Sequence, residues 1–403
     1  MRKLLILSDL HAYRGTPSGS PPSHLKVDSS HALASMFSGI VGTLQKEGIT
    51  PDLIICPGDL ADKADPVAQS NAWAQMEELK TVLGASQLIG TAGNHDVDSR
   101  LVFTEFDPKG VLQSLQPAFP GGTEIEVDRY WARNFVIYEF GDLRIVNLNS
   151  AAFHGIASDE RDTSTHISEY KRGRVSKSTV SSIVNSIKNK SFKHNVLLTH
   201  HHVRKNDIYE RDDSDMIGAA HLLRQLEDNS DTPWLVIHGH QHYPEVEYAS
   251  GGSEAAIVFS AGSFAARIEA TFAARAPNQF YFIEICDDAT ETGDWSPCGT
   301  IKAWHWVPHE GWSRSPANYN IPYGSGFGCR ENNQTLATKV VTEINGSSEK
   351  FLTLKQVLDR VPQLKFVLPS ARRRVLERVE KSGIVVALTD DADIEKSTLR
   401  KSS

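Results

Sequence analysis

Short hydrophobic runs and longer periodic segments alternate along the first hundred residues. Residues 3–8, 52–56 and 87–90 are rich in aliphatic side chains, which predicts buried strands. Residues 30–46 and 68–83 repeat their apolar positions at a spacing of about 3.6, which predicts helices between those strands. The order β-α-β-α-β is typical of a parallel sheet joined by crossover helices.

Strand patterns continue after residue 130. Residues 135–140 and 143–148 flank Gly141-Asp142, a turn-forming dipeptide, so we expect them to pair as a hairpin. Further strands are expected at 195–199 and 234–238 and, in a second sheet, at 246–248, 256–260, 280–285 and 300–306, with helices at 176–188 and 216–226.

The chain changes character after residue 308. Residues 309–345 are rich in Gly, Asn, Ser and Pro without periodicity, which predicts an extended linker or arm. Helical spacing returns at 354–361 and 370–381, and Ser370 is the expected N-cap of the second helix. The last ten residues are expected to fray. We therefore expect a main domain at 1–308, the linker at 309–345 and a small, basic, mostly helical accessory region at 346–403.

Length and charge limit the classes of protein to consider. A chain of 403 residues is long enough for two or three domains of about 150 residues each. It holds 42 Lys and Arg against 50 Asp and Glu, a net charge of −8, and residues 346–403 hold 12 basic against 8 acidic residues. Proteins that grip nucleic acid over a broad surface usually have a basic footprint, so the acidic main domain argues against that class.

The basic residues of the accessory region cluster in one expected helix, as Arg372-Arg373-Arg374, Arg378 and Lys381. We interpret this run as the solvated face of a docking helix, because charge runs are usually solvated. A protein partner bound by residues 346–403 and a nucleic-acid partner are the alternatives.

No segment reaches the about 20 apolar residues that a membrane helix needs. The N-terminus begins like a signal peptide, but its apolar run at residues 4–7 ends at Ser8-Asp9, which is too short. We therefore expect a cytoplasmic protein with no membrane partner.

Histidine and cysteine counts narrow the chemistry of a bound metal. The chain has 16 His but 4 widely spaced Cys, which excludes a disulfide scaffold and a thiolate zinc finger, so any metal would have nitrogen and oxygen ligands. Five short blocks supply such donors, and each follows an expected strand, whose carboxyl end lies at the ligand-binding edge of an open α/β sheet. They are Asp9-Leu10-His11, Gly58-Asp59, Gly93-Asn94-His95-Asp96, His200-His201-His202 and Gly239-His240-Gln241-His242.

The residue types in these blocks suit a pair of divalent metals. Residues two apart in an extended segment point the same way, so Asp9 and His11 can face one cavity, as can His240 and His242. The Asp59 carboxylate can bridge two metals, and the next block adds an amide oxygen. Imidazole and carboxylate bind Mn, Fe, Zn or Ni, which leaves the identity of the metal open.

This set of blocks resembles the calcineurin-like metallophosphoesterases over residues 1–308. The spacing between Gly58-Asp59 and the block that begins at Gly93, with Gly173-Arg174-Val175-Ser176 before the His triplet, is nearest to the class III cyclic-nucleotide phosphodiesterase branch. The resemblance implies an α/β fold, a four-layer αββα sandwich of two mixed β-sheets flanked by helices, to which a small C-terminal helical appendage would be added. It also implies a metal-dependent phosphoric ester hydrolase with two divalent metal ions.

The resemblance also assigns the ligands. One metal would be held by Asp9, His11, Asp59 and His242, and the other by Asp59, Asn94, His200 and His240, with Asp59 bridging. Within the triplet, His200 is favoured because it comes directly after the expected strand. His201 is the alternative, either as a metal ligand or as a neighbour of the ligands.

Residues outside this ligand set receive roles in the expected reaction. A water that bridges the metals would become a hydroxide and attack phosphorus. We expect His95 to contact the phosphoryl group or to protonate the leaving oxygen, and Asp96 either to orient His95 or only to cap the loop. Asp62 matches a frequent family position or caps the next helix. Residues 98–130 are placed to wall the mouth of the site and help select the leaving group.

The expected function is hydrolysis of a phosphoester by a phosphodiesterase or phosphatase that acts on a small molecule or a nucleotide, with manganese among the metals. One alternative is a metal-dependent DNA or RNA nuclease. Another is a regulatory scaffold that keeps the metal site and binds a partner. The acidic main domain disfavours the nuclease, because it would repel a polyanion. The intact ligand set disfavours the scaffold.

Overall fold

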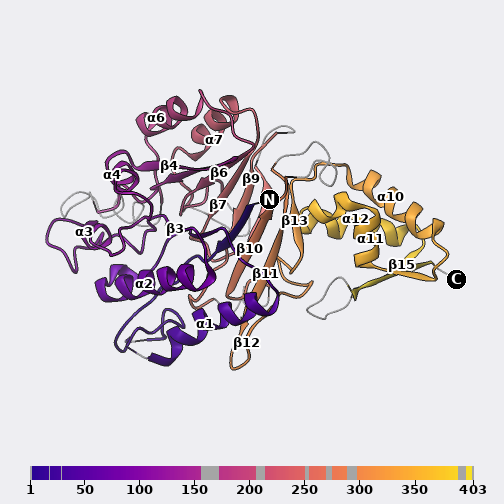
Figure 1. Cartoon of the computed structure of the whole chain (residues 1–403), viewed down its shortest axis with the longest axis horizontal. Coiled ribbons are helices and arrows are strands. Elements are labelled where there is room, and N and C mark those ends of the chain that lie inside the picture. The colour runs from indigo at the N-terminus through magenta and orange to yellow at the C-terminus, as the bar shows by residue number, and fades with distance from the viewer. Residues whose placement is uncertain are drawn as a thin grey trace.

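Two β-sheets pack together at the centre of the main body, and helices cover their outer faces (Figure 1). This computed structural model describes residues 2–17, 19–28, 30–155, 172–205, 214–249, 254–268, 275–287, 297–388 and 396–401. The first sheet has the order β12 (Gly311–Arg314), β11 (Gly299–Val307), β10 (Gln279–Ile285), β1 (Arg2–Ile6), β2 (Leu53–Cys56) and β3 (Gln87–Gly90). The second has the order β4 (Phe135–Phe140), β5 (Leu143–Leu148), β6 (His194–Leu198), β7 (Trp234–His238), β9 (Ile257–Ser260) and β8 (Glu245–Tyr248). The expected four-layer α/β architecture with two mixed sheets is confirmed.

The first three strands and their crossover helices form as the sequence pattern predicts. β1, β2 and β3 pair in parallel, with Leu4 beside Leu53. The connecting helices are α1 (Ser30–Lys46) and α2 (Pro66–Leu83). Because both faces of these strands are covered, they read as continuous apolar runs rather than as an alternation. Their carboxyl ends lie together at one edge of the sheet.

The second sheet is built around the predicted hairpin. β4 and β5 are antiparallel, with Phe135 opposite Leu148, and β5, β6, β7 and β9 follow in parallel. α6 (Lys177–Ile187) and α7 (Ala219–Asp228) pack their apolar faces on this sheet. Neither these helices nor any other in the described ranges is long and apolar enough to cross a membrane.

Two strands that the pattern places in the second sheet belong to the first. β10 pairs antiparallel with β1, with Arg2 opposite Ile285, and β11 extends the sheet beyond β10. The prediction for residues 280–285 and 300–306 is therefore wrong about the sheet, although right about the strands. Hydrophobicity shows that a strand is buried, but not which open sheet edge it pairs with.

The expected linker at residues 309–345 is replaced by regular structure. β12 and the short strand β13 (Ser325–Phe327) pair with β11. Residues 333–345 lie in helix α10 (Asn333–Gly346). The linker prediction is wrong because the Gly, Pro and Asn content of the whole segment obscures the helical spacing of the aliphatic residues at its end.

Helix α10 begins a C-terminal unit with its own hydrophobic core, drawn from orange to yellow in Figure 1. Its other elements are β14 (Phe351–Thr353), α11 (Leu354–Arg360), η2 (Pro362–Phe366), α12 (Pro369–Lys381), β15 (Ile384–Ala387) and β16 (Thr398–Lys401). β16 pairs with both β14 and β15, so the prediction that the last residues fray is wrong for this strand. α12 starts at Pro369, before the predicted N-cap Ser370.

The C-terminal unit contacts the main body through the turn before α12 and the start of that helix. Arg372 donates from Nη1 to the Gly324 carbonyl at 2.8 Å, and the Cys329 N–H donates to the Phe366 carbonyl at 2.9 Å. Arg372 is only 3% exposed. The first arginine of the predicted basic run is therefore buried in this contact, whereas the two that follow it are exposed.

Candidate metal centre

Loops at the carboxyl ends of five strands meet at one edge of the two sheets. The loops after β1 and β2 are joined by backbone hydrogen bonds, from the Asp9 N–H to the Gly58 carbonyl and from the His11 N–H to the Asp59 carbonyl, each at 3.0 Å. The loop after β7 joins them where the His240 N–H donates to the Asp9 carboxylate at 3.0 Å, across 231 residues of sequence. The predicted blocks therefore gather in one place.

One group of donor atoms comes from the first and last blocks. His242 Nε2 lies 3.4 Å from Asp9 Oδ1 and 3.0 Å from His11 Nε2. His11 Nε2 in turn lies 3.4 Å from Asp59 Oδ2. These four side chains are the set that the family resemblance assigns to one metal.

A second group lies beside the first and shares Asp59 with it. His200 Nε2 lies 3.3 Å from Asp59 Oδ2 and 3.0 Å from Asn94 Oδ1. His240 Nδ1 is 2.9 Å from the same amide oxygen and 3.3 Å from His200 Nε2. The structure thus brings together the four side chains assigned to the other metal, with one Asp59 oxygen near both groups.

Most of these side chains are carried on left-handed backbone, which the sequence analysis missed. The φ angles are 53° at Asp9, 47° at His11, 58° at Asp59, 78° at His240 and 53° at His242. Such angles are uncommon for residues other than glycine and gather at functional sites. The argument from an extended segment is therefore wrong about the backbone, although each pair does face one cavity.

Two glycines of the blocks are required by the close approach of acidic side chains. A Cβ on Gly93 would lie 2.1 Å from Asp59 Oδ1. A Cβ on Gly239 would lie 2.4 Å from Asp9 Oδ2. Any side chain at either position would displace a predicted ligand, which explains why Gly precedes the ligand in each block.

The Asp96 carboxylate accepts hydrogen bonds from the backbone of two neighbouring loops. Its Oδ2 accepts the N–H groups of Asp59 at 2.8 Å and Gly93 at 2.9 Å, and its Oδ1 accepts that of Leu60 at 2.7 Å. Burial, together with the nearby Asp59 carboxylate, raises the pKa of Asp96 to about 6. These are the contacts of the predicted loop cap, and the carboxylate that lies beside His95 Nδ1 is that of Asp62.

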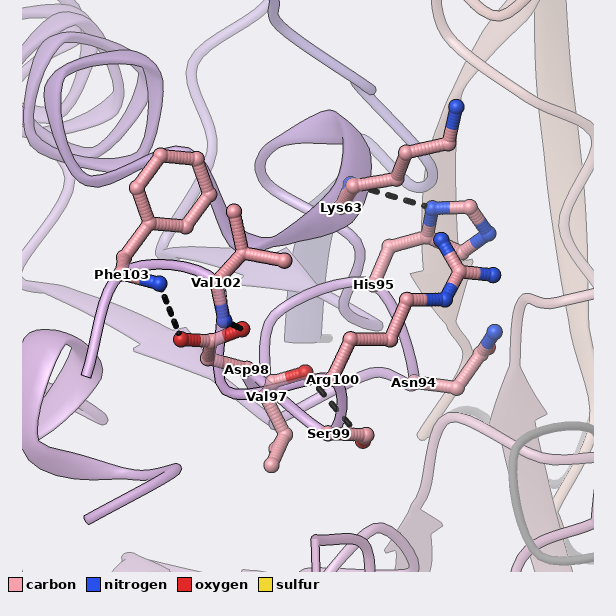
Figure 2. A pocket seen from close by; sticks show the side chains of 9 residues that line it. All are labelled: Lys63, Asn94, His95, Val97, Asp98, Ser99, Arg100, Val102 and Phe103. Carbon is pink, nitrogen blue, oxygen red and sulfur yellow. Dashed lines mark hydrogen bonds between the residues drawn. The ribbon is translucent and has the colours of Figure 1, made fainter. Parts of the chain in front are cut away.

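His95 is paired with Asp62, at the wall of a cavity (Figure 2). His95 Nδ1 lies 3.1 Å from Asp62 Oδ1, and His11 Nδ1 lies 4.0 Å from the same oxygen. Burial would lower the pKa of His95, but the Asp59 and Asp62 carboxylates outweigh it and raise the pKa above its ordinary value. Asp65, not Asp62, is the N-cap of α2. Asp62 therefore belongs to the site.

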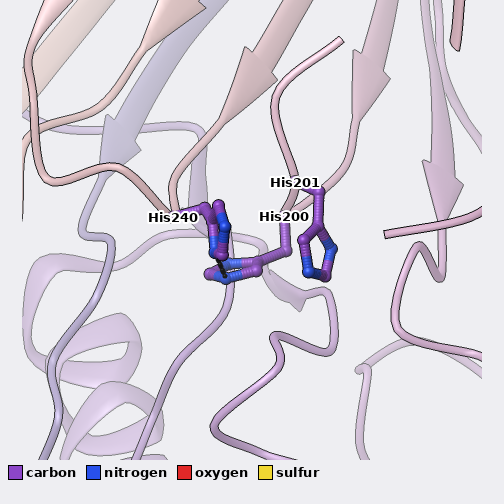
Figure 3. A group of neighbouring side chains, drawn as sticks. All are labelled: His200, His201 and His240. Atoms are coloured by element: carbon purple, nitrogen blue, oxygen red, sulfur yellow. Dashed lines mark hydrogen bonds between the residues drawn. The ribbon is translucent and has the colours of Figure 1, made fainter. Parts of the chain in front are cut away.

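The first two histidines of the triplet point to different partners (Figure 3). His200 Nδ1 donates to the Pro57 carbonyl at 2.7 Å, so in the neutral imidazole its Nε2 carries the lone pair toward His240 and the shared oxygens. His201 Nδ1 lies 2.8 Å from the Ser150 hydroxyl. His201 Nε2 is buried and has no hydrogen-bond partner within the described residues. His200 thus has the contacts expected of a ligand, and a ring nitrogen of His201 lies within 4.8 Å of ring nitrogens of His200 and His240.

The sequence model of the calcineurin-like phosphoesterase family matches residues 2–244, more than half of the chain. The chain belongs to the calcineurin-like phosphoesterase family. The matched range includes all five blocks and ends two residues after His242.

Several individual proteins resemble this family member over part of their length. A cAMP/cGMP dual specificity phosphodiesterase from Mycobacterium tuberculosis is 33% identical over 93 residues, which are 23% of this chain and 26% of that relative. A purple acid phosphatase from yellow lupin matches with 12% identity and a TM-score of 0.44, over 75% of this chain and 51% of its own. A putative 5′-nucleotidase from Staphylococcus aureus matches with 12% identity and a TM-score of 0.38, over 77% and 52%. The chain thus spans about a quarter of the curated relative and about half of each of these structures.

The residues of this family member are suited to binding divalent cations. Burial lowers the pKa of His11 to about 3 and that of His240 well below its ordinary value, so both imidazoles are neutral and offer lone pairs. Burial would also lower the pKa of His200, but Asp59 raises it to about 9, so this imidazole must lose a proton before it can bind a cation. The centre therefore brings together imidazole nitrogens, carboxylate oxygens and an amide oxygen, and its predicted ligands include no thiolate. Donors of these types bind divalent cations.

Proposed function

We propose that this protein is a metal-dependent phosphodiesterase that hydrolyses a small-molecule or nucleotide phosphodiester. The observation that carries the proposal is the position of Asp59. One of its oxygens lies 3.4 Å from His11 Nε2 and 3.3 Å from His200 Nε2, so a single carboxylate joins two groups of donor atoms. Such a shared carboxylate suits two cations held side by side.

The proposed ligands divide as the sequence resemblance implies. Asp9, His11, Asp59 and His242 would hold one cation, and Asp59, Asn94, His200 and His240 the other. When bound, the cation pair supplies an acidified water and neutralises charge on the phosphoryl oxygens. We propose His200 rather than His201 as the ligand, because the contacts of His200 reach both Asp59 and Asn94.

His95 is the proposed general acid. With Nδ1 beside Asp62, Nε2 is the nitrogen left to give a proton to the leaving oxygen. The P–O bond to that oxygen breaks, the oxygen of water becomes bonded to phosphorus, and the products are a phosphomonoester and an alcohol. Asp62 holds the imidazole in orientation and favours its protonated form. The similarity to a cyclic-nucleotide phosphodiesterase supports a diester substrate of nucleotide type.

The decisive test removes the shared carboxylate. Removing a residue that only hydrogen-bonds to a metal ligand usually lowers metal affinity or activity by about 10- to 100-fold. Because Asp59 is itself a proposed ligand, Asp59→Asn should lower kcat/KM for bis(p-nitrophenyl) phosphate by at least about 100-fold. The protein is loaded with Mn²⁺, and bound metal is measured by elemental analysis. The variant should also bind less metal than the wild-type protein.

The matched control is Asp359→Asn, at a half-exposed carboxylate of the C-terminal unit that pairs with Lys355. It should keep both activity and metal content. Hydrolysis that survives in Asp59→Asn would show that the activity comes from another site or from a contaminant, and the proposal would be rejected.

A nuclease is the second candidate, because α12 exposes a basic surface. Its residues Arg373, Arg374, Arg378 and Lys381 are all exposed. Phosphate groups of a nucleic acid bind such clusters. Plasmid DNA, added to the same metal-loaded protein, distinguishes this candidate from a small-molecule phosphodiesterase.

A further inference from the structure

A cavity of about 200 Å³ opens beside the proposed metal centre (Figure 2). Asn94 and His95 line the side next to the centre, together with Lys63, and residues 97–100, 102 and 103 line the rest. Pockets that hold a whole small ligand usually measure about 300–1,000 Å³. The cavity is therefore sized for one part of a substrate whose reacting phosphorus lies outside it, at the metal centre.

The cavity has a basic side and an apolar side. Figure 2 shows the nitrogen-bearing ends of Lys63, His95 and Arg100 on one side and the side chains of Val102 and Phe103 on the other. The basic side is shared with the metal centre, where the anionic phosphoryl group would lie. The apolar side is farther from it. A ligand that is anionic at one end and apolar at the other matches this arrangement.

The apolar side is built on a loop that a buried carboxylate holds in place. Asp98 is 3% exposed and accepts the N–H groups of Val102, Phe103 and Thr104 at 2.9, 2.7 and 2.9 Å. It also accepts the Thr104 hydroxyl at 3.1 Å. Val102 and Phe103 nevertheless remain 65% and 40% exposed. An ordered loop that keeps apolar side chains exposed beside a polar centre is typical of a ligand-binding surface.

We propose that this cavity binds the leaving group of the substrate and that this leaving group carries an aromatic ring, which packs on Phe103. The inference rests on the proposed function and adds a substrate class to it. His95 connects the two, because it lines the cavity and is the proposed donor of the proton to the leaving oxygen. The group bonded to that oxygen then extends past His95 toward Phe103. Aromatic rings favour such ring-on-ring packing.

Methyl p-nitrophenyl phosphate tests this assignment, because its only ring is the leaving group. With Mn²⁺-loaded protein, Phe103→Ala should raise KM by about three- to tenfold, the range of an aromatic contact. Its kcat should change less than about twofold, because the contact is made equally in the ground state and the transition state. The matched control is Phe106→Ala, at a phenylalanine of the same loop that is 85% exposed and does not line the cavity, and its KM should stay unchanged.

Dimethyl phosphate, which has the same charge and no ring, reports on the metal centre alone. Its inhibition constant should be equal in the wild-type protein and in Phe103→Ala. An unchanged KM in Phe103→Ala, or an equal rise in the inhibition constant, would overturn the cavity assignment while the proposed function stands. If Phe103→Ala does not fold, Phe103→Leu replaces it, with a smaller rise in KM expected. Absence of hydrolysis by metal-loaded wild-type protein would overturn the proposed function as well.

Discussion

Individual residues at the centre carry backbone strain that the surrounding hydrogen bonds offset. Left-handed backbone at a non-glycine residue costs on the order of 1–3 kcal/mol, and five of the seven proposed ligands have it. Around Asp9, the Ser263 hydroxyl donates to the backbone carbonyl at 2.6 Å, and the Ser8 hydroxyl donates to the carboxylate at 2.5 Å. Such strain persists only where neighbours determine the conformation. The ligand loops are therefore ordered by the protein itself.

The proposed role of His95 as the general acid can be tested by substitution. His95→Ala should retain both metals, because none of the proposed ligands is changed. It should lose about 100- to 10,000-fold in kcat on a diester with a poor leaving group, the range of general acid catalysis. On bis(p-nitrophenyl) phosphate the loss should be smaller, because p-nitrophenolate leaves without a proton.

Asp62→Asn serves as the graded companion, since it keeps the imidazole and removes only the charge beside its Nδ1. Its kcat should fall between those of the wild-type protein and His95→Ala, with metal content unchanged. Full activity of His95→Ala on the poor leaving group, measured with stoichiometric metal bound, would exclude His95 as the general acid.

Helix α1 is joined to the far edge of the first sheet by the residue that follows it. Glu47 accepts hydrogen bonds from Arg314 Nε at 2.9 Å, Tyr323 Oη at 2.6 Å and Trp304 Nε1 at 3.3 Å. Two of these donors lie in the segment that the sequence pattern predicts as a linker. Burial would raise the pKa of Glu47, but these hydrogen bonds and the charge of Arg314 outweigh it and lower the pKa below its ordinary value of 4.5.

Glu47→Gln should therefore destabilise the main body, by about 1–3 kcal/mol at pH 7. A carboxylate with a lowered pKa in the folded state stabilises above its unfolded pKa, and that contribution disappears as the pH falls through the folded pKa. The difference between variant and wild type, measured by urea unfolding, should accordingly shrink from pH 7 to pH 4. Glu78→Gln, at an exposed position of α2, should change stability at neither pH. An equal difference at both pH values would mean that the charge of Glu47 does not matter.

The molecule combines an acidic main body with a basic C-terminal helix. Residues 1–345 carry a net charge of −12, although the chain as a whole carries −8. The exposed basic residues of α12 lie on the C-terminal unit, and the start of that helix is occupied by its contact with the main body. A long nucleic acid at the metal centre would therefore meet repulsion from most of the protein.

The dependence of hydrolysis on salt concentration distinguishes a small-molecule phosphodiesterase from a nuclease. Hydrolysis of bis(p-nitrophenyl) phosphate should change less than about threefold between 50 and 300 mM KCl, and plasmid DNA should stay intact, because few counterions are released when a small monoanion binds. Plasmid cleavage that falls steeply with salt, and that is lost when Arg373, Arg374 and Arg378 are all changed to Gln, would instead support the nuclease.

Local patterns predicted most elements, and long-range pairing accounts for the errors. The strands at 87–90, 135–140 and 143–148 have the predicted bounds, because turn residues and apolar runs mark them locally. The sheet that β10 joins depends on an open edge at β1, about 280 residues earlier in the chain. No local pattern contains that information.

The sequence by itself determined which side chains could form the centre and that each follows a strand. Because the carboxyl ends of such strands share an edge, this was enough to predict that Asp9, Asp59 and His200 come together. Only the tertiary structure decided that Asp62 faces His95 while Asp96 caps the loop. Hydrogen-bond partners depend on how loops from different strands pack, and left-handed backbone redirects side chains that a regular strand would place elsewhere.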